Sequence, residues 1–217
     1  MPALLSEFAS PTEVEIQNAW KDAVFVLDTN VLLHIYRYPE QLRESLFKAI
    51  DSVKGSLWIP HHVALEFERR RTDIIFSEKD NTEQAGKNLT KLKNDIQKII
   101  DQADFDKWTI TFDYAGSLKK ITTELDELST AVSKISERRL QLSSGDEHRD
   151  RLASIVSGGI GAAYESQAFL EAIYREGEER YARKVPPGYG DEKTKDKTPD
   201  YQHGGLVYKP KFGDLII

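Results

Sequence analysis

Three acidic residues far apart in the chain have the side chains best suited to chemistry. Asp28 directly follows an uninterrupted apolar run, residues 23–27, which predicts a central strand of a parallel sheet covered on both faces. Glu66 lies in the helix expected after the next strand, and Asp214 lies where another helix or strand begins. Because open α/β sheets bind ligands at the carboxyl ends of their strands, we expect Asp28 and Glu66 to converge there.

Oxygen ligands of this type suit a hard divalent cation. The chain has no cysteine, and its five histidines do not fall at metal-binding spacing. Carboxylates that lie close together repel each other, and Mg²⁺ or Mn²⁺ keeps them ionised together. Such a cation activates water and stabilises the charge that develops on a phosphodiester. We therefore hypothesise metal-assisted phosphodiester hydrolysis, with Asp28, Glu66 and Asp214 as catalytic residues and metal ligands.

Each of these acids also has a plainer interpretation. Asp28 can cap the helix expected to begin near Val31, because aspartate is a common residue at helix N-caps. Glu66 can be an exposed helical glutamate, and Asp214 can simply interact with a helix dipole. For Asp28, capping and catalysis are compatible, so both interpretations stay open.

The elements that would position these acids come from the first 80 residues. Residues 57–59 form a short apolar run closed by Pro60, and helical periodicity follows each of the two runs. Strand, helix, strand and helix in succession predict a right-handed parallel unit and an α/β fold.

Residues 81–183 have the composition of a helical insertion. Apolar residues step by three and four along two stretches separated by a break, which predicts an antiparallel helical hairpin. The second stretch has the clearer seam, at Leu118, Ile121, Leu125, Leu128, Val132 and Ile135. A protein partner or a second copy of the chain on its outer face is left open.

Residues 184–217 are expected to form a basic loop that returns to the core. From Arg183 to Lys211 there are seven basic and four acidic residues, although the whole chain has a net charge of −6. A polyanion would therefore need a local basic patch. The side chains proposed to contact nucleic-acid phosphates are those of Arg69, Arg70, Arg71, Lys184 and Lys193. A solvated helix face and a solvated loop are the alternative.

Composition sets the remaining limits. The 217 residues are 39% hydrophobic and 30% charged, and no apolar run approaches the ~20 residues of a membrane span. The N-terminus has no signal-peptide pattern, and the absence of cysteine excludes disulfides. We expect a cytoplasmic protein with no membrane association.

Four blocks of the sequence resemble, in the same order, those of a bacterial PIN-like domain. The blocks are residues 26–37, 58–67, 183–193 and 212–217. The closest variety has a long helical insertion and is often met in phage-defence and toxin-like proteins. The resemblance implies a three-layer α/β/α core and a metal-dependent nuclease that usually acts on RNA.

The resemblance also assigns roles to individual residues. Asp28, Glu66 and Asp214 match the first three acids of the family, with Thr29 and Asn30 as polar groups that shape the site. Asp191 lies in the Pro-Pro-Gly block and is expected to support the site. Two departures are Arg70-Arg71, where many relatives have Asn-Arg, and the fourth acid, which would lie on a strand after Ile217. The chain is therefore expected to be truncated, or completed by a partner.

Other functions remain possible from sequence. The chain can be a catalytically silent PIN-like interaction module, or its substrate can be DNA, cut in single strands or flaps, because hydrolysis by water needs no ribose 2′-hydroxyl. A phosphotransfer fold is less suitable, since it places a second acid two residues after the strand-end aspartate, and that position is Asn30.

Overall fold

The computed structural model describes residues 9–102, 114–137, 145–190, 192–195 and 197–217. The chain divides into two compact units. The first comprises Met1–Arg69 with Arg149–Ile217, and the second comprises Arg70–His148. The helical insertion expected at residues 81–183 stays a prediction; in the structure its part from Arg149 onward belongs to the first unit.

A short parallel sheet forms one part of the first unit. Strand β1 (Phe25–Val26) pairs with β2 (Leu57–Trp58), and Ile59 continues the pairing with a parallel bridge to Ile160. Helix α1 (Glu13–Asp22) precedes β1, and the short 3-10 helix η2 (Lys54–Ser56) precedes β2. The predicted α/β class with parallel pairing is confirmed, whereas the three-layer core stays a prediction.

The burial predicted for the first strand is wrong. Val24 and Val26 are 65% and 49% exposed, and Trp58, the register partner of Val26, is 41% exposed. Side chains alternate between the two faces of a strand, and in the described residues this face is left open to solvent. A continuous apolar run therefore predicted two covered faces where the structure covers one.

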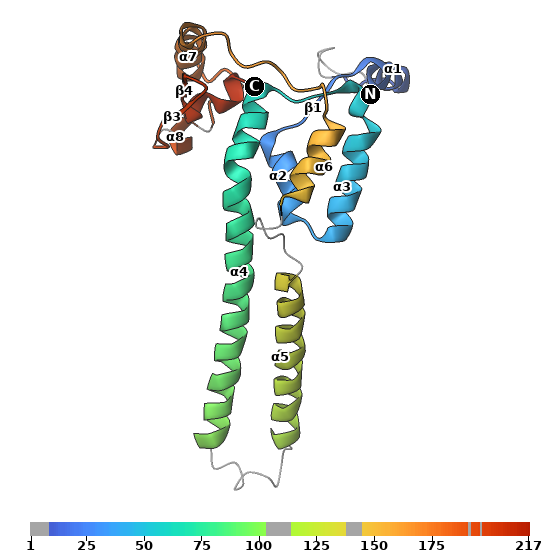
Figure 1. Cartoon of the computed structure of the whole chain (residues 1–217), viewed down its shortest axis with the longest axis vertical. Helices are drawn as coiled ribbons and strands as arrows, with labels where there is room; N and C mark the ends of the chain where they lie inside the picture. Colours follow the sequence, from blue (N-terminus) through green and yellow to red (C-terminus); the bar gives the residue numbers. More distant parts are fainter. Residues whose placement is uncertain (1–8, 103–113, 138–144, 191, 196) are drawn as a thin grey trace. The chain divides into compact units, whose positions relative to one another are not determined.

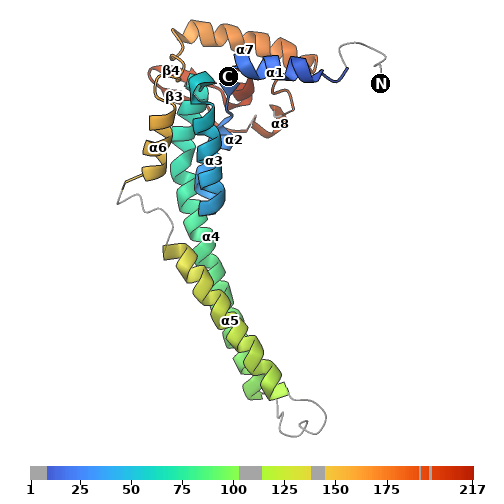
Figure 2. The same ribbon diagram turned by 90° about the vertical axis from the view of Figure 1, so that its right-hand side faces the viewer.

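Two helices follow β1 and pack against each other. Helix α2 (Thr29–Arg37) is capped by Asp28, and α3 (Glu40–Ser52) begins directly after Pro39. Helix α6 (Glu147–Ile155) lies beside α3 in both views (Figures 1 and 2). There the Arg151 guanidinium donates to Glu44 Oε1 at 2.6 Å, which fastens α6 to α3.

A second group of elements packs around an aromatic cluster. It comprises helix α7 (Gln167–Ala182), the short helix α8 (Glu192–Lys195), strands β3 (Tyr201–His203) and β4 (Leu206–Tyr208), and the 3-10 helix η5 (Pro210–Leu215). The buried residues of this cluster are Leu65, Leu170, Tyr174, Tyr181, Tyr208, Phe212 and Ile216. Leu65 belongs to the helix that carries Glu66, so the cluster supports that helix directly.

The prediction of a loop within residues 184–217 is partly wrong, because two short strands form there. Gly204 and Gly205, both with positive φ, make a two-residue turn between β3 and β4, which pair antiparallel. Two glycines between short apolar runs are a recognised hairpin signal that the sequence already contained.

The second unit is a pair of antiparallel helices. Helix α4 (His61–Gln102) enters it from the first unit, and α5 (Tyr114–Glu137) runs alongside the later part of α4 in both views (Figures 1 and 2). Lys93 Nζ contacts Asp126 Oδ1 at 2.5 Å between them. The helical pattern that begins at His61 predicts a helix end near Ser77, and this prediction is wrong, because no proline interrupts the chain there and α4 continues.

Only part of the predicted heptad seam is buried. Leu125 is 9% exposed, whereas Ile121, Leu128 and Ile135 are 45%, 54% and 52% exposed. The three exposed positions are spaced seven residues apart, so in the described residues one of the two apolar positions of each heptad is about half exposed.

Candidate active site

A hydrogen bond joins the end of β1 to helix α4. Thr29 Oγ1 donates to Glu66 Oε2 at 2.6 Å, and the Thr29 side chain is buried. The cause is the parallel pairing of β1 with β2, which brings the carboxyl ends of both strands to one edge of the sheet. Asp28 follows β1 at that edge, and α4 begins there after β2. The structure therefore brings together the segments that carry Asp28 and Glu66.

Asp28 is exposed and is held locally. Its Oδ2 accepts from the backbone N–H of Asn30 at 3.3 Å and from Asn30 Nδ2 at 3.1 Å. The capping interpretation is therefore correct for Asp28. One of its carboxylate oxygens makes both contacts, so capping leaves the other oxygen for a further ligand. Asn30 orients the acid, which is one way to shape a site.

His62 lies on the same face of α4 as Glu66, one helical turn earlier. The imidazole is 4% exposed and stacks on Tyr208, with ring centroids 5.7 Å apart. Burial lowers the pKa of His62 to about 4, against an opposing effect of the Glu66 carboxylate. Its Nδ1 has no hydrogen-bond partner among the described residues. A buried, neutral imidazole therefore lies one helical turn before Glu66 on α4.

The residue before Asp214, Gly213, lies close to the start of α4. A Cβ placed on Gly213 would lie 3.7 Å from His62 Nε2, so η5 passes close to the first turn of α4. Asp214 Oδ1 itself pairs with Lys195 Nζ at 3.5 Å. Gly188 of the Pro-Pro-Gly block, with a φ of 86°, lies against Asp214, because an added Cβ would come within 3.1 Å of the Asp214 Cβ. Asp191, expected to support the site, lies outside the described residues.

The segments carrying the three acids gather around the start of α4, but their carboxylates do not form a complete metal cage. Within the described ranges, no group of three acidic or histidine side chains is close enough to hold a metal ion. Mg²⁺ needs fewer, because it usually keeps several waters and is held by one or two carboxylates together with substrate phosphates. The strand-end acid and the Thr29-bound Glu66 carboxylate fit that kind of site by their chemistry.

The predicted phosphate contacts fall in different places. The Arg69 guanidinium lies 3.3 Å from the ring centroid of Tyr201. Burial raises the pKa of Tyr201 to about 12, with Arg69 opposing the shift. Arg71 pairs with Asp146 at 2.5 Å inside the second unit, to which Arg70 also belongs.

The two predicted lysines lie near α7 and α8. Lys184 is exposed just after the C-terminus of α7, where its positive φ and its N–H bond to the Tyr181 carbonyl end the helix. Lys193 is exposed on α8. Arg69 and Glu66 share Tyr201 as a neighbour: the guanidinium lies on its ring, and the Glu66 carboxylate acts on its hydroxyl.

Three residues outside the predicted site set lie near it in the structure: His62, Lys195 and Tyr201. From sequence, a histidine at a helix start can contact substrate but is more often structural; the position of His62 one turn before Glu66 is the signal that favours a place near the site. Tyr201 begins the β3 strand, which the Gly204-Gly205 turn would have revealed. Lys195 had no sequence signal, since its contact depends on how α8 packs on η5.

Comparison with known proteins gives one family. The family model described as a PIN like domain matches residues 24–217, a span that includes Asp28, Glu66 and Asp214. Comparison with curated proteins found no match, and neither did comparison with solved structures. In the described ranges, no helix combines the length and the apolar character that a membrane crossing requires.

Proposed function

The chain belongs to the PIN-like domain family, whose members are generally nucleases, and on this basis we propose that it is a metal-dependent endonuclease that hydrolyses phosphodiester bonds in RNA. The observation that carries the proposal is the partly buried Thr29–Glu66 hydrogen bond at the shared strand edge. It ties the acid on α4 to the residue that follows Asp28.

Asp28 and Glu66 would hold Mg²⁺ or Mn²⁺, and Asp214 would complete the acidic rim. Activation of water and stabilisation of charge on the phosphoryl oxygens are what such a cation supplies when bound. The protein's own residues hold the carboxylates in place: Thr29 fixes one Glu66 oxygen, and Asn30 fixes one Asp28 oxygen. Such neighbours set the orientation and basicity of metal ligands.

His62 has a supporting part in this proposal. Because burial holds its pKa near 4, the imidazole stays neutral at physiological pH and adds no positive charge beside Glu66. A protonated histidine there would compete with a cation for the carboxylate. Asp214, in contrast, is already paired with the Lys195 ammonium.

A second candidate is a catalytically silent interaction module. It is favoured by the apolar residues left exposed on the helical pair of the second unit: Leu92, Ile99, Ile121, Leu128 and Ile135. These could contact a protein partner or a second copy of the chain. A role in phage defence or in a toxin-like system, and a cytoplasmic location, belong to the nuclease proposal.

The decisive experiment compares Asp28→Asn and Glu66→Gln with the wild type on labelled RNA and on DNA of the same sequence. With Mg²⁺ or Mn²⁺ each variant is expected to lose roughly 100-fold or more of the cleavage rate, because a metal ligand is removed. Asp22→Asn, at the exposed end of α1, is the matched control and should cleave normally.

EDTA and circular dichroism complete the test. Cleavage by the wild type should stop in EDTA, and both variants should keep the wild-type helical spectrum. Unchanged cleavage by Asp28→Asn and Glu66→Gln would reject the assignment. A wild type that cuts neither RNA nor DNA would favour the interaction module, and cleavage of DNA alone would change the substrate.

A further inference from the structure

A small polar cavity lies next to Asp214, whose ion-pair partner Lys195 is one of the lining residues. Its volume is about 240 Å³, and its walls come from α7, α8 and the segment around the start of η5. The lining residues are Glu178, Lys195, Thr198, Asp200, Lys209, Pro210 and Lys211. Three lysines therefore face one small space in a protein with a net charge of −6.

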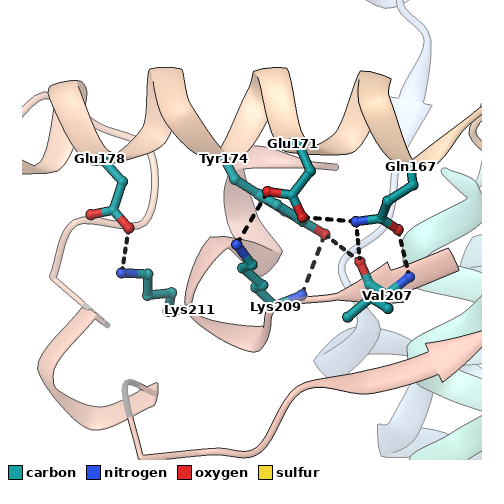
Figure 3. A network of polar contacts seen from close by, with 7 residues as sticks. All are labelled: Gln167, Glu171, Tyr174, Glu178, Val207, Lys209 and Lys211. Atoms are coloured by element: carbon teal, nitrogen blue, oxygen red, sulfur yellow. Dashed lines mark hydrogen bonds and ion pairs between the residues drawn. The ribbon is translucent and has the colours of Figure 1, made fainter.

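Two of these lysines are held in place by α7. Lys209 Nζ contacts Glu171 Oε2 at 3.3 Å, and Lys211 Nζ contacts Glu178 Oε1 at 2.7 Å (Figure 3). Each ammonium also lies near an aromatic ring, at 5.1 Å from the Tyr174 centroid for Lys209 and 4.8 Å from the Phe212 centroid for Lys211. The rings and carboxylates restrict where the charges can go, which lowers the ordering cost of binding a ligand.

Lys209 and Lys211 can donate further hydrogen bonds while they are paired with carboxylates. An ammonium group has three N–H donors, and one carboxylate contact occupies only part of that capacity. The Lys209 and Lys211 side chains are 33% and 20% exposed, so they are partly shielded from water while still reaching the cavity. An anion bound there would interact with them more strongly than on an open surface.

The third lysine connects the cavity to the candidate active site. Lys195 lines the cavity and pairs with Asp214 Oδ1 at 3.5 Å. A ligand in the cavity would therefore lie one side chain away from the third acid. Because lysine binds phosphate as a compact point charge, this arrangement suits a tetrahedral oxyanion.

We propose that the cavity of Lys195, Lys209 and Lys211 binds a backbone phosphate of single-stranded nucleic acid beside the cleavage site. This inference rests on the proposed function, because it names where that substrate's backbone lies. The small volume suits one phosphate group, since cavities for whole drug-sized ligands are roughly 300 Å³ or larger. A phosphate in this cavity would be bound independently of the base sequence.

The test measures binding without cleavage. The full chain is titrated in EDTA into fluorescently labelled single-stranded RNA and DNA of one sequence, and anisotropy is followed over about 50–200 mM KCl. Each of Lys195→Gln, Lys209→Gln and Lys211→Gln should weaken binding to any sequence and lower the slope of log K against log[KCl] by about 0.7. Lys48→Gln, on the exposed face of α3, is the matched control and should bind as the wild type does.

A variant of opposite sign keeps the test independent of folding damage. Glu178→Gln removes the carboxylate paired with Lys211, so it should tighten binding if the cavity takes an anion. If instead the lysine variants bind normally and only unfold more easily, the ion pairs merely fasten α7 to the η5 segment, and the proposal is overturned. A wild type that binds no oligonucleotide overturns it as well.

Two further measurements separate the possible sources and failures. Titration with inorganic phosphate identifies a site for the free ion: lysine-dependent binding of that ion, with no lysine effect on the oligonucleotide, would overturn the backbone assignment. If the oligonucleotide binds in a lysine-dependent way but is never cut when Mg²⁺ or Mn²⁺ is added, the phosphate cavity stands and the proposed nuclease activity fails.

Discussion

The two compact units use their apolar residues in different ways. In the first unit Leu170 and Phe212 are completely buried in an aromatic cluster that also contains Leu65, next to Glu66. In the second unit Leu92 and Leu128 are 49% and 54% exposed on their helices. Burial is thus concentrated where the candidate site is built. The packed cluster of the first unit can hold side chains in fixed positions, whereas the second unit exposes apolar surface that a partner could contact.

The same substitution in both units tests this contrast most strongly. Leu170→Ala should lower the free energy of unfolding of the first unit by about 3 kcal/mol, because it leaves a cavity in a fully packed cluster. Leu128→Ala should change it by less than about 0.5 kcal/mol, since half of that side chain already contacts water. Guanidinium unfolding followed by circular dichroism measures both. Equal losses would show that the exposed leucine is covered in solution, for instance by a second copy of the chain.

The Thr29–Glu66 hydrogen bond provides the next largest effect. Thr29→Val keeps the shape of the buried side chain but removes the donor to the Glu66 carboxylate. The free energy of unfolding should fall by about 2 kcal/mol, because hydrogen bonds to charged groups contribute more to stability than hydrogen bonds between neutral groups. The nuclease proposal also requires a lower cleavage rate. Thr29→Ser, which retains the hydroxyl, should recover most of the activity, and failure to do so would show that packing rather than the hydrogen bond matters.

Acid should weaken the first unit through His62. The pKa of this group is about 4 when folded and about 6.5 when unfolded, so below pH 6.5 the unfolded chain takes up the proton first. Stability is unaffected above pH 6.5 and falls between pH 6.5 and about 4. At pH 5.5 the free energy of unfolding should be about 1.4 kcal/mol lower than at neutral pH.

The control for this effect is His62→Phe, which keeps a ring against Tyr208 but cannot titrate. Urea unfolding in EDTA at several pH values should show a shallower decline for the variant. The pKa of His61 is also lowered by burial, so some decline remains. An identical pH dependence in wild type and variant would contradict the prediction.

The smallest effect is expected at the ion pair between the helices of the second unit. Lys93 and Asp126 lie 2.5 Å apart, but both side chains are more than 40% exposed. Exposed pairs contribute little, so Lys93→Gln should cost less than about 0.5 kcal/mol, and salt should reduce that further. A loss above 1 kcal/mol in thermal unfolding would mean that this pair is shielded from water in solution.

The parts of the fold that sequence could predict are those set by neighbouring residues. Asp28 as a helix cap, the strand that ends at Pro60 and the proximity of Asp28's segment to Glu66 follow from local chemistry and the geometry of parallel pairing. The exposed side of Val24 and Val26 could not be predicted, because an apolar run does not say how many faces are covered.

The contacts around Asp214 could not be predicted from the sequence, for a different reason. Its pairing with Lys195 joins a four-residue helix to η5, and His62 meets Gly213 across 151 positions of the chain. No periodicity or cap encodes such contacts, since they depend on how the aromatic cluster packs. The continuity of α4 was missed because the absence of a breaker is a weaker signal than its presence.

Two glycines that are separated by one tyrosine differ sharply in what they would tolerate. Gly188 has its backbone close against Asp214 and the Tyr181 hydroxyl, whereas no atom of the described residues lies within 4 Å of a Cβ added at Gly190. A fluorophore or an affinity tag could therefore be attached at residue 190 to follow the protein in solution. Even a methyl group at residue 188 would collide with the Tyr181 hydroxyl and crowd the Asp214 Cβ.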